Sequence, residues 1–330
     1  IAYAVAARAT ASSLFTITSN DYEKTHSFRA VGSSLSSSYA FESSAYTTVT
    51  PINSNLTVTM RYSKPNSSAM AWMRFLYVNV YRQLKYNGGT LFFRYPTSTL
   101  NEEIAEFNIT GSSKNFSLYN ITDPAEPKLV KYTTSGNTSK FKDFTIDNQE
   151  YVCFDGTDTK TVTYIGKVAN QNIHGLEIAD MVIVYYRDFY NAADKLHNFH
   201  VNNGLKVHNI CIDDIYNEFS SGMQDVCAIR DMMRYWYKNS DENNCPKYLL
   251  LVGDASYDPL DRLTNNTNFI PIYQSKETLS PSYSYCSDDF YGFLDDDEGS
   301  MGSYDLLDIS VGRIPVQTAE QANQIVDKMI

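Results

Sequence analysis

The pattern of hydrophobic and polar positions changes near residue 176, and the two halves predict different secondary structure. In the first half, short β-branched and aromatic runs are separated by turns that contain Gly and Asn, a pattern typical of a β-sandwich or barrel. The first 50 residues are rich in Ser, Thr and Ala, and their pattern is too weak to place any element. We predict strands over Leu56–Tyr62, Met73–Tyr81, Thr90–Tyr95, Ile104–Ile109, Lys128–Thr133, Phe141–Ile146 and Glu150–Phe154.

In the second half, short apolar runs alternate with stretches of helical periodicity. A chain that alternates in this way builds a parallel sheet with right-handed crossovers. Helical faces follow Asp188 and Asp225, and Thr318 with Gln321 forms a capping box that begins a last helix. The apolar stripe of that helix is still running at Ile330, so we expect a domain truncated at its C-terminus. The predicted strands are Met181–Tyr186, Leu205–Ile212, Tyr248–Val252 and Leu306–Val311.

The change of pattern predicts two domains, which the length of 330 residues can accommodate. We expect residues 1–175 to form a β-rich N-terminal accessory domain and residues 176–330 to form the first half of an α/β catalytic domain.

Composition and charge narrow the function classes. The net charge of −11 and the pI of about 4.9 do not suit nucleic acid or an anionic membrane, and they suit cations better. No run approaches the ~18 consecutive apolar residues of a membrane span. The five cysteines are scattered without zinc-ligand spacing, which excludes a disulfide scaffold and gives no support for a zinc site.

The segment Lys247–Pro259, KYLLLVGDASYDP, carries the first candidate for chemistry. Its apolar run predicts a buried strand, and Asp254 follows at the carboxyl end of that strand. Ligands of open parallel sheets bind at this edge. An Asp in this position can equally well do no more than hydrogen-bond the turn after the strand.

A second candidate is the acidic loop Asp295–Glu298, which is followed by Asp308. Hard cations bind several carboxylate oxygens together with backbone carbonyls. Most acidic loops are solvated surface, but a carboxylate within the apolar run 306–311 needs a partner because burying it alone is costly. Asp308 therefore favours a cation site.

From Ala179 onward the chain resembles the gingipain family of cysteine peptidases, which have a caspase-like fold, and within it the PorU-type sortases of the bacterial type IX secretion system. The resemblance rests on KYLLLVGDASYDP, FIPIYQS, SDDFYGFLDDDEG and DISVGRIPVQTAEQANQIVDKMI, in the family's order, and covers roughly 150 residues. It implies a caspase-like, gingipain-type parallel-sheet subdomain preceded by a mostly-β N-terminal domain.

The resemblance also implies which site residues are present. The family's catalytic Cys and His lie beyond the strand–helix unit that ends here, so no residue of this chain is assigned to the dyad. The one His-Gly pair, His174-Gly175, precedes the first α/β strand. By resemblance, a Ca²⁺ site is formed by Asp254, Asp295, Asp297, Asp308 and the carbonyl of Leu306. Asp308 is shorter than the Glu of some relatives.

The family implies that the whole protein cleaves C-terminal sorting domains from secreted cargo and transfers the cargo to a cell-surface amine acceptor. Its partners would be that cargo and other components of the secretion system, at the outer-membrane surface or secreted. Two alternatives stay open. One is a non-catalytic binding or scaffold module of the secretion machinery. The other is a Mg²⁺-dependent phosphotransfer domain, which lacks support because no Gly-rich phosphate cradle is present.

Overall fold

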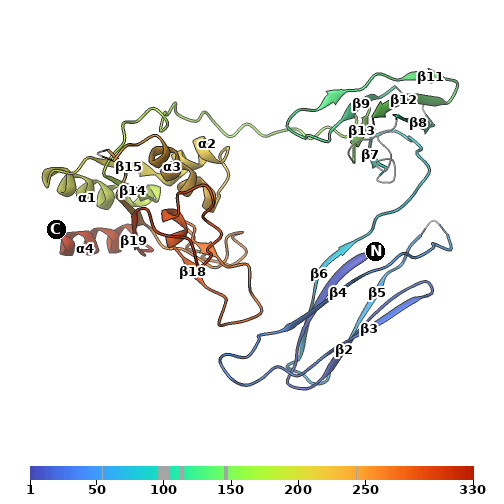
Figure 1. The fold of residues 1–330 in the computed structure, drawn as a ribbon, viewed down its shortest axis with the longest axis horizontal. Helices are drawn as coiled ribbons and strands as arrows, with labels where there is room; N and C mark the ends of the chain where they lie inside the picture. The colour runs from blue at the N-terminus through green and yellow to red at the C-terminus, as the bar shows by residue number, and fades with distance from the viewer. Residues whose placement is uncertain (54, 96–103, 112–114, 145–147, 243) are drawn as a thin grey trace. The chain divides into compact units, whose positions relative to one another are not determined.

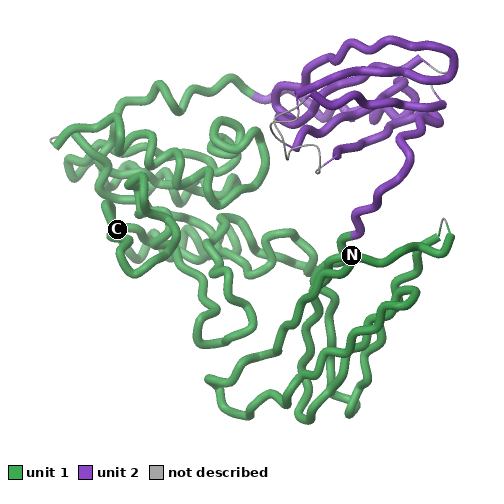
Figure 2. Tube along the Cα trace, turned by 45° about the vertical axis from the view of Figure 1, so that its right-hand side comes forward, with its two compact units in different colours: residues 1–77, 169–330 green, residues 78–168 purple. Residues whose placement is uncertain are grey.

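The computed structural model describes residues 1–330 except 54, 96–103, 112–114, 145–147 and 243. The chain divides into two compact units, residues 1–77 with 169–330 and residues 78–168 (Figure 2). No helix among the described residues is long and apolar enough to cross a membrane.

Residues 1–77 form a β-sandwich from two three-stranded antiparallel sheets, in the strand orders β4-β1-β6 and β3-β2-β5. The alternating residues of β2 point into one shared core with Tyr3, Val5 and Phe28. The first 50 residues, which the sequence pattern could not place, therefore contain four strands. The strands are β1 (Ala2–Arg8), β2 (Ser13–Ser19), β3 (Tyr22–Phe28), β4 (Phe41–Tyr46), β5 (Thr59–Ser63) and β6 (Met70–Tyr77).

Residues 78–168 form a separate β unit with its own aromatic core, which includes Tyr86, Phe141 and Tyr151. Its sheets have the orders β10-β9-β13-β7 and β11-β12-β8. The expected strand 128–133 is wrong, because its two ends are short strands in different sheets. Residues 145–146 of the expected strand 141–146 lie outside the described residues. The strands are β7 (Thr90–Arg94), β8 (Ile104–Thr110), β9 (Ser117–Asn120), β10 (Lys128–Leu129), β11 (Thr133–Ser135), β12 (Thr138–Phe144) and β13 (Glu150–Phe154).

Residues 169–330 contain the predicted parallel sheet, in the order β15-β14-β16-β19 (Figure 1). The strands are β14 (Met181–Tyr185), β15 (Val207–Cys211), β16 (Tyr248–Val252) and β19 (Ser310–Ile314). All three pairings are parallel, and β16 lies between β14 and β19. The caspase-like fold class and the neighbouring parallel strands are confirmed.

Helices cover both faces of this sheet. Alternate residues of β14 divide between two cores: one contains Val182 and residues of α2 and α3, and the other contains Ile183 and residues of α1 and α4. The helices are α1 (Tyr190–Asn202), α2 (Ile212–Phe219), α3 (Val226–Lys238) and α4 (Ala319–Met329). Smaller elements are the 3₁₀ turns η2 (Arg187–Phe189) and η3 (Asp289–Gly292) and the paired strands β17 (Tyr273–Gln274) and β18 (Cys286–Ser287).

Local sequence signals set several of these boundaries. Asp225 caps α3 by accepting a hydrogen bond from the Cys227 N–H, and Thr318 caps α4 by accepting one from the Gln321 N–H. The last strand is β19, beginning at Ser310, and not the expected run 306–311. Asp308 therefore precedes the strand and does not lie within it.

Candidate functional site

The acidic loop after η3 and the segment before β19 bring three carboxylates together. One oxygen each from Asp295, Glu298 and Asp308 lies within 4.8 Å of the others. Glu298 belongs to the acidic loop but is not among the ligands that the family resemblance implies. The spacing could have identified Glu298 as a ligand, because it lies three residues after Asp295 in a turn, where the two side chains can face each other. The three carboxylates form the candidate cation site of this chain.

Asp308 is held by donors from two other elements. One oxygen accepts a hydrogen bond from the Tyr237 hydroxyl of α3 at 2.9 Å, and the other accepts one from the Leu294 N–H at 2.8 Å. The hydrogen bond to Asp308, followed by burial, raises the pKa of Tyr237 to about 12, so the phenol keeps its proton at neutral pH. The expectation of an Asp in an apolar strand is therefore wrong, because Asp308 precedes the strand and has two partners.

Neither Asp295 nor Glu298 forms an ion pair with a described residue, so their negative charges are not neutralised. The negative charge of Asp308 is the largest cause that raises the pKa of Asp295, ahead of desolvation and the charge of Glu298. Glu298 accepts hydrogen bonds from the Leu306 N–H at 2.9 Å and the Asp295 N–H at 3.3 Å. Like charges this close repel, and a divalent cation would relieve the repulsion.

The middle of the acidic loop has a different role. Asp296 pairs with Arg234 and Lys238 of α3, and the hydrogen bond from Lys238 is the largest cause that lowers the pKa of Asp296. Asp297 is exposed and lies outside the group of three carboxylates. Asp296 thus ties the loop to α3, while its neighbour Asp295 faces Asp308.

Asp254 does not join this group, and the register of the parallel strands shows why. Val252 of β16 pairs with Ile314 of β19, and the Asp254 N–H bonds the Val316 carbonyl, so Asp254 lies at the carboxyl edge of the sheet. Asp308 precedes β19 and lies at the amino edge. With a rise of ~3.3 Å per residue, these two edges are separated by the whole length of β19. The predicted convergence of Asp254 with the other carboxylates is therefore wrong.

At the carboxyl edge Asp254 holds loops in place. One carboxylate oxygen accepts hydrogen bonds from the Thr267 hydroxyl and the Gln317 side-chain amide, both at 2.7 Å. Gly253, before it, has a φ of +152°, and a Cβ there would meet Ile270 at 3.2 Å. The turn-bonding alternative that the sequence left open for Asp254 agrees with these contacts.

Arg313 of β19 is the centre of this edge, and it was not among the residues predicted from the sequence. Its guanidinium donates to both oxygens of Asp288 at 2.8 and 2.6 Å. It also donates to the carbonyls of Gly253, Ile270 and Pro271 at 2.9–3.0 Å. The only sequence signal was a basic residue in an apolar strand, which requires a partner when buried.

The surroundings of the cysteines bear on nucleophilic chemistry. Burial raises the pKa of Cys153 to about 12, and burial is also the main cause that raises the pKa of Cys211 to about 11. A thiol with such a pKa is a poor nucleophile at neutral pH, because the thiolate is the reactive form. The ring of His174 is hydrogen-bonded to Glu218 at 2.6 Å and stacks on Phe219. These environments agree with assigning none of these residues to a catalytic dyad.

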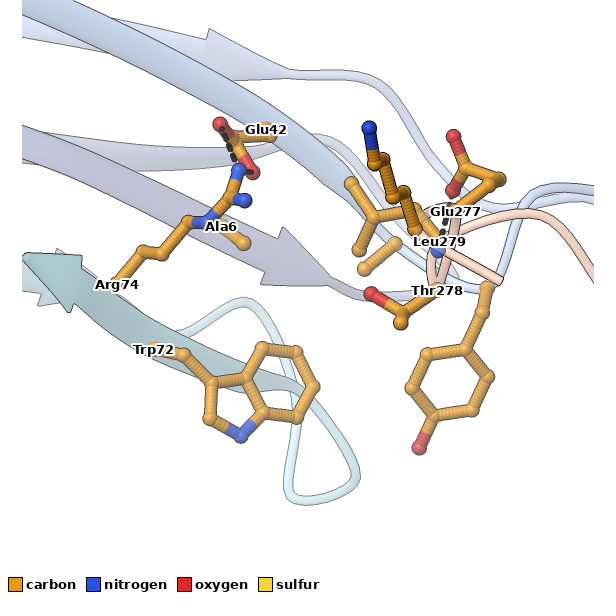
Figure 3. Close-up of a pocket in the computed structure, with 10 residues that line it drawn as sticks. Ala6, Glu42, Trp72, Arg74, Glu277, Thr278 and Leu279 are labelled. Carbon is orange, nitrogen blue, oxygen red and sulfur yellow. Dashed lines mark hydrogen bonds and ion pairs between the residues drawn. The ribbon is translucent and has the colours of Figure 1, made fainter. Parts of the chain in front are cut away.

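A cavity of about 670 Å³ is lined by Tyr39, Trp72 and the Glu42–Arg74 ion pair together with residues 276–279 of the loop after β17 (Figure 3). Glu42 is neutralised by Arg74, and Glu277 accepts hydrogen bonds from backbone N–H groups of its own loop. Both acidic side chains of the cavity are thus engaged, and we assign no chemistry to it.

The four-stranded parallel sheet and the helices on its two faces form a caspase-like α/β subdomain. The sequence model of peptidase family C25 matches residues 174–330. Of the solved structures, the dimeric latent PorU from Porphyromonas gingivalis matches with a TM-score of 0.82 and 25% identity, over 99% of this chain. This chain spans 33% of that PorU chain.

A second solved structure, described as a protease, matches 45% of this chain and 26% of its own at 20% identity. Its TM-score of 0.33 is too low to support an inference. No curated protein matches the chain.

Proposed function

We propose that this chain is part of a cysteine peptidase that acts as a sortase on secreted cargo. The observation that carries the proposal is the similarity to PorU over 99% of the chain, together with the family C25 match of residues 174–330. The similarity includes the N-terminal β regions, which a match of the peptidase subdomain alone would not include.

The proposed reaction is acyl transfer. A thiolate of the whole protein attacks the peptide bond before the C-terminal sorting domain of the cargo, and the sorting domain leaves with a new amino terminus. The acyl-enzyme is then resolved by an amine on a cell-surface acceptor, which restores the thiol and leaves the cargo amide-linked. The partners are therefore cargo with a sorting domain and other secretion components, at the cell envelope or outside the cell.

The role we propose for residues 169–330 in this reaction is structural support. Arg313 and Asp254 fix the loops at the carboxyl edge of the sheet, the edge at which open α/β sheets bind their ligands. Neither side chain needs to react for this role.

We further propose that the three carboxylates Asp295, Glu298 and Asp308 bind Ca²⁺. The closeness of their oxygens and the mutual repulsion that raises the pKa of Asp295 support a cation there. A cation would tie the acidic loop to the start of β19. Oxygen ligands from carboxylates suit Ca²⁺, which tolerates irregular geometry better than Mg²⁺ does.

A fusion of a reporter protein to a C-terminal sorting domain tests the proposed function, with a small primary amine added as acceptor. The whole protein that contains this chain should release the sorting domain and attach the amine to the reporter, as mass spectrometry would show. The 330-residue chain alone should give no turnover, since none of its cysteines is assigned as nucleophile.

Two results would contradict the proposal. Turnover that persists after every cysteine is replaced by Ala would exclude a cysteine peptidase. Specific binding of the sorting domain without any cleavage by the whole protein would favour the non-catalytic scaffold module instead.

A further inference from the structure

A chain of hydrogen bonds crosses the N-terminal sandwich from one sheet to the other. His26 of β3 belongs to one sheet, and its ring lies between two side chains of the other sheet. Its Nε2 lies 2.9 Å from the Tyr3 hydroxyl of β1, and its Nδ1 lies 2.7 Å from the Ser43 hydroxyl of β4. The Tyr3 hydroxyl also lies 3.0 Å from the Tyr22 hydroxyl. This polar bridge therefore links three strands across the core.

The bridge closes one side of the sandwich. In the strand orders β3-β2-β5 and β4-β1-β6, both β3 and β4 are edge strands, so each has a backbone partner on one side only among the described strands. His26 and Tyr3 are buried, at 6% and 0% exposure. The His26–Ser43 hydrogen bond joins these two edge strands, between which no backbone ladder runs.

The hydrogen bonds of the bridge can all be made by a neutral imidazole ring. A neutral ring offers one donor and one acceptor, and the Tyr3 and Ser43 hydroxyls can each take either role. Of the groups beside the ring, Tyr3 on β1 and Ser43 on β4 contribute hydroxyls, Tyr22 on β3 contacts the Tyr3 hydroxyl, and Phe15 of β2 is the apolar cross-strand partner of His26. Among the described residues, the charged group that acts on the ring is Lys24, two residues along β3 on the same face.

The surroundings therefore oppose a charged ring. No carboxylate hydrogen-bonds His26 in the part of the chain that the structure describes. Burial of the ring, followed by the positive charge of Lys24, lowers the pKa of His26 below its ordinary value of 6.5. A buried imidazolium next to an ammonium group destabilises the folded sandwich relative to the open one.

We propose that this bridge is an acid-sensitive latch, in which protonation of His26 releases the β3–β4 side of the N-terminal sandwich. The direction of the pH effect follows from the linkage between proton binding and folding. The unfolded state takes up the proton at the ordinary pKa and the folded state only at a lower pH, so the stabilisation is complete above about pH 6.5. It is lost as the pH falls from there toward the folded-state pKa.

Hydrogen–deuterium exchange of the 330-residue chain tests the latch, at several pH values from 8 to 5 and corrected for intrinsic exchange rates. Peptides that cover β3 and β4 should lose protection as the pH falls below 6.5, while peptides that cover β16 keep theirs. His26→Gln, whose amide keeps a donor and an acceptor but does not titrate, should abolish the pH dependence. Lys24→Glu should weaken it, since a carboxylate stabilises the imidazolium.

If His26→Gln does not fold, Lys24→Glu still tests the proposal, because Lys24 is exposed and can be replaced without disturbing the core. Unchanged protection of β3 and β4 down to pH 5 in the wild type would overturn the proposal. So would an equal loss of protection in wild type and His26→Gln, or a stronger loss in Lys24→Glu.

Discussion

Arg313→Met removes the guanidinium group that holds the carboxyl edge of the parallel sheet, while it keeps most of the apolar stem. The Arg313 side chain is 9% exposed and that of Asp288 is 20% exposed. The substitution leaves the Asp288 carboxylate largely buried without its cation, and the carbonyls of Gly253, Ile270 and Pro271 each lose a donor. We expect this region to be the part of the molecule that the change destabilises.

The loss of stability in Arg313→Met is determined mainly by the Asp288 carboxylate, which is left without its cationic partner. Five hydrogen bonds at about 1.5–3 kcal/mol each would sum to about the whole stability of a domain, so they cannot simply add. Breaking a buried ion pair on one side costs about 3–5 kcal/mol. Water can reach Asp288 through its exposed fifth, and we therefore expect the lower end, about 3 kcal/mol.

Urea unfolding measured by tryptophan fluorescence is the assay. The chain has two tryptophans, Trp72 in the N-terminal sandwich and Trp236 in the core of the α/β region. A Trp72→Phe background leaves Trp236 as the reporter of that region, which avoids a single two-state fit to a chain with several cores. The midpoint for Arg313→Met should fall well below that of the background.

The matched control is Arg187→Met, which removes an exposed Arg from its pair with Asp213 at 2.8 Å. With side-chain exposures of 63% and 38%, that pair should contribute less than about 1 kcal/mol. Asp288→Asn should recover part of the loss when combined with Arg313→Met, because no unpaired charge remains. If Arg313→Met and Arg187→Met lower the stability by the same small amount, the reasoning from the buried charge is refuted.

Two further predictions concern the acidic loop and the cysteines. EGTA should lower the melting temperature of the chain, and Ca²⁺ should restore it more than Mg²⁺ does; Glu298→Gln should abolish this response, whereas Asp296→Asn, with the same change of charge, should keep it. If EGTA does not change the melting temperature of the wild type, the acidic loop is ordinary solvated surface and the proposed cation site is refuted. Iodoacetamide at pH 8 should alkylate the exposed Cys286 in the folded chain and spare Cys153, which is buried with a raised pKa. Equal labelling of both, measured by mass spectrometry of peptides, would contradict the burial of Cys153.

The local pattern of the sequence determined the strands and helices of the α/β region. Apolar runs such as Met181–Tyr186 identify strands because a strand buried on both faces has no polar positions to interrupt it. Caps such as Asp225 and Thr318 are equally local, since each bonds a backbone N–H within three residues. The N-terminal strands were missed because Ser and Thr occupy many of their positions, including the buried Ser13 and Ser19.

Only the tertiary structure decided which carboxylates meet. Asp254 follows one parallel strand and Asp308 precedes the next, so the common direction of the strands places them at opposite edges. The partner of Asp308, Tyr237, is 71 residues away along the chain, and Asp288 is 25 residues from Arg313. Contacts of this kind depend on strand order and on helix packing across the sheet, which no local pattern of residues specifies.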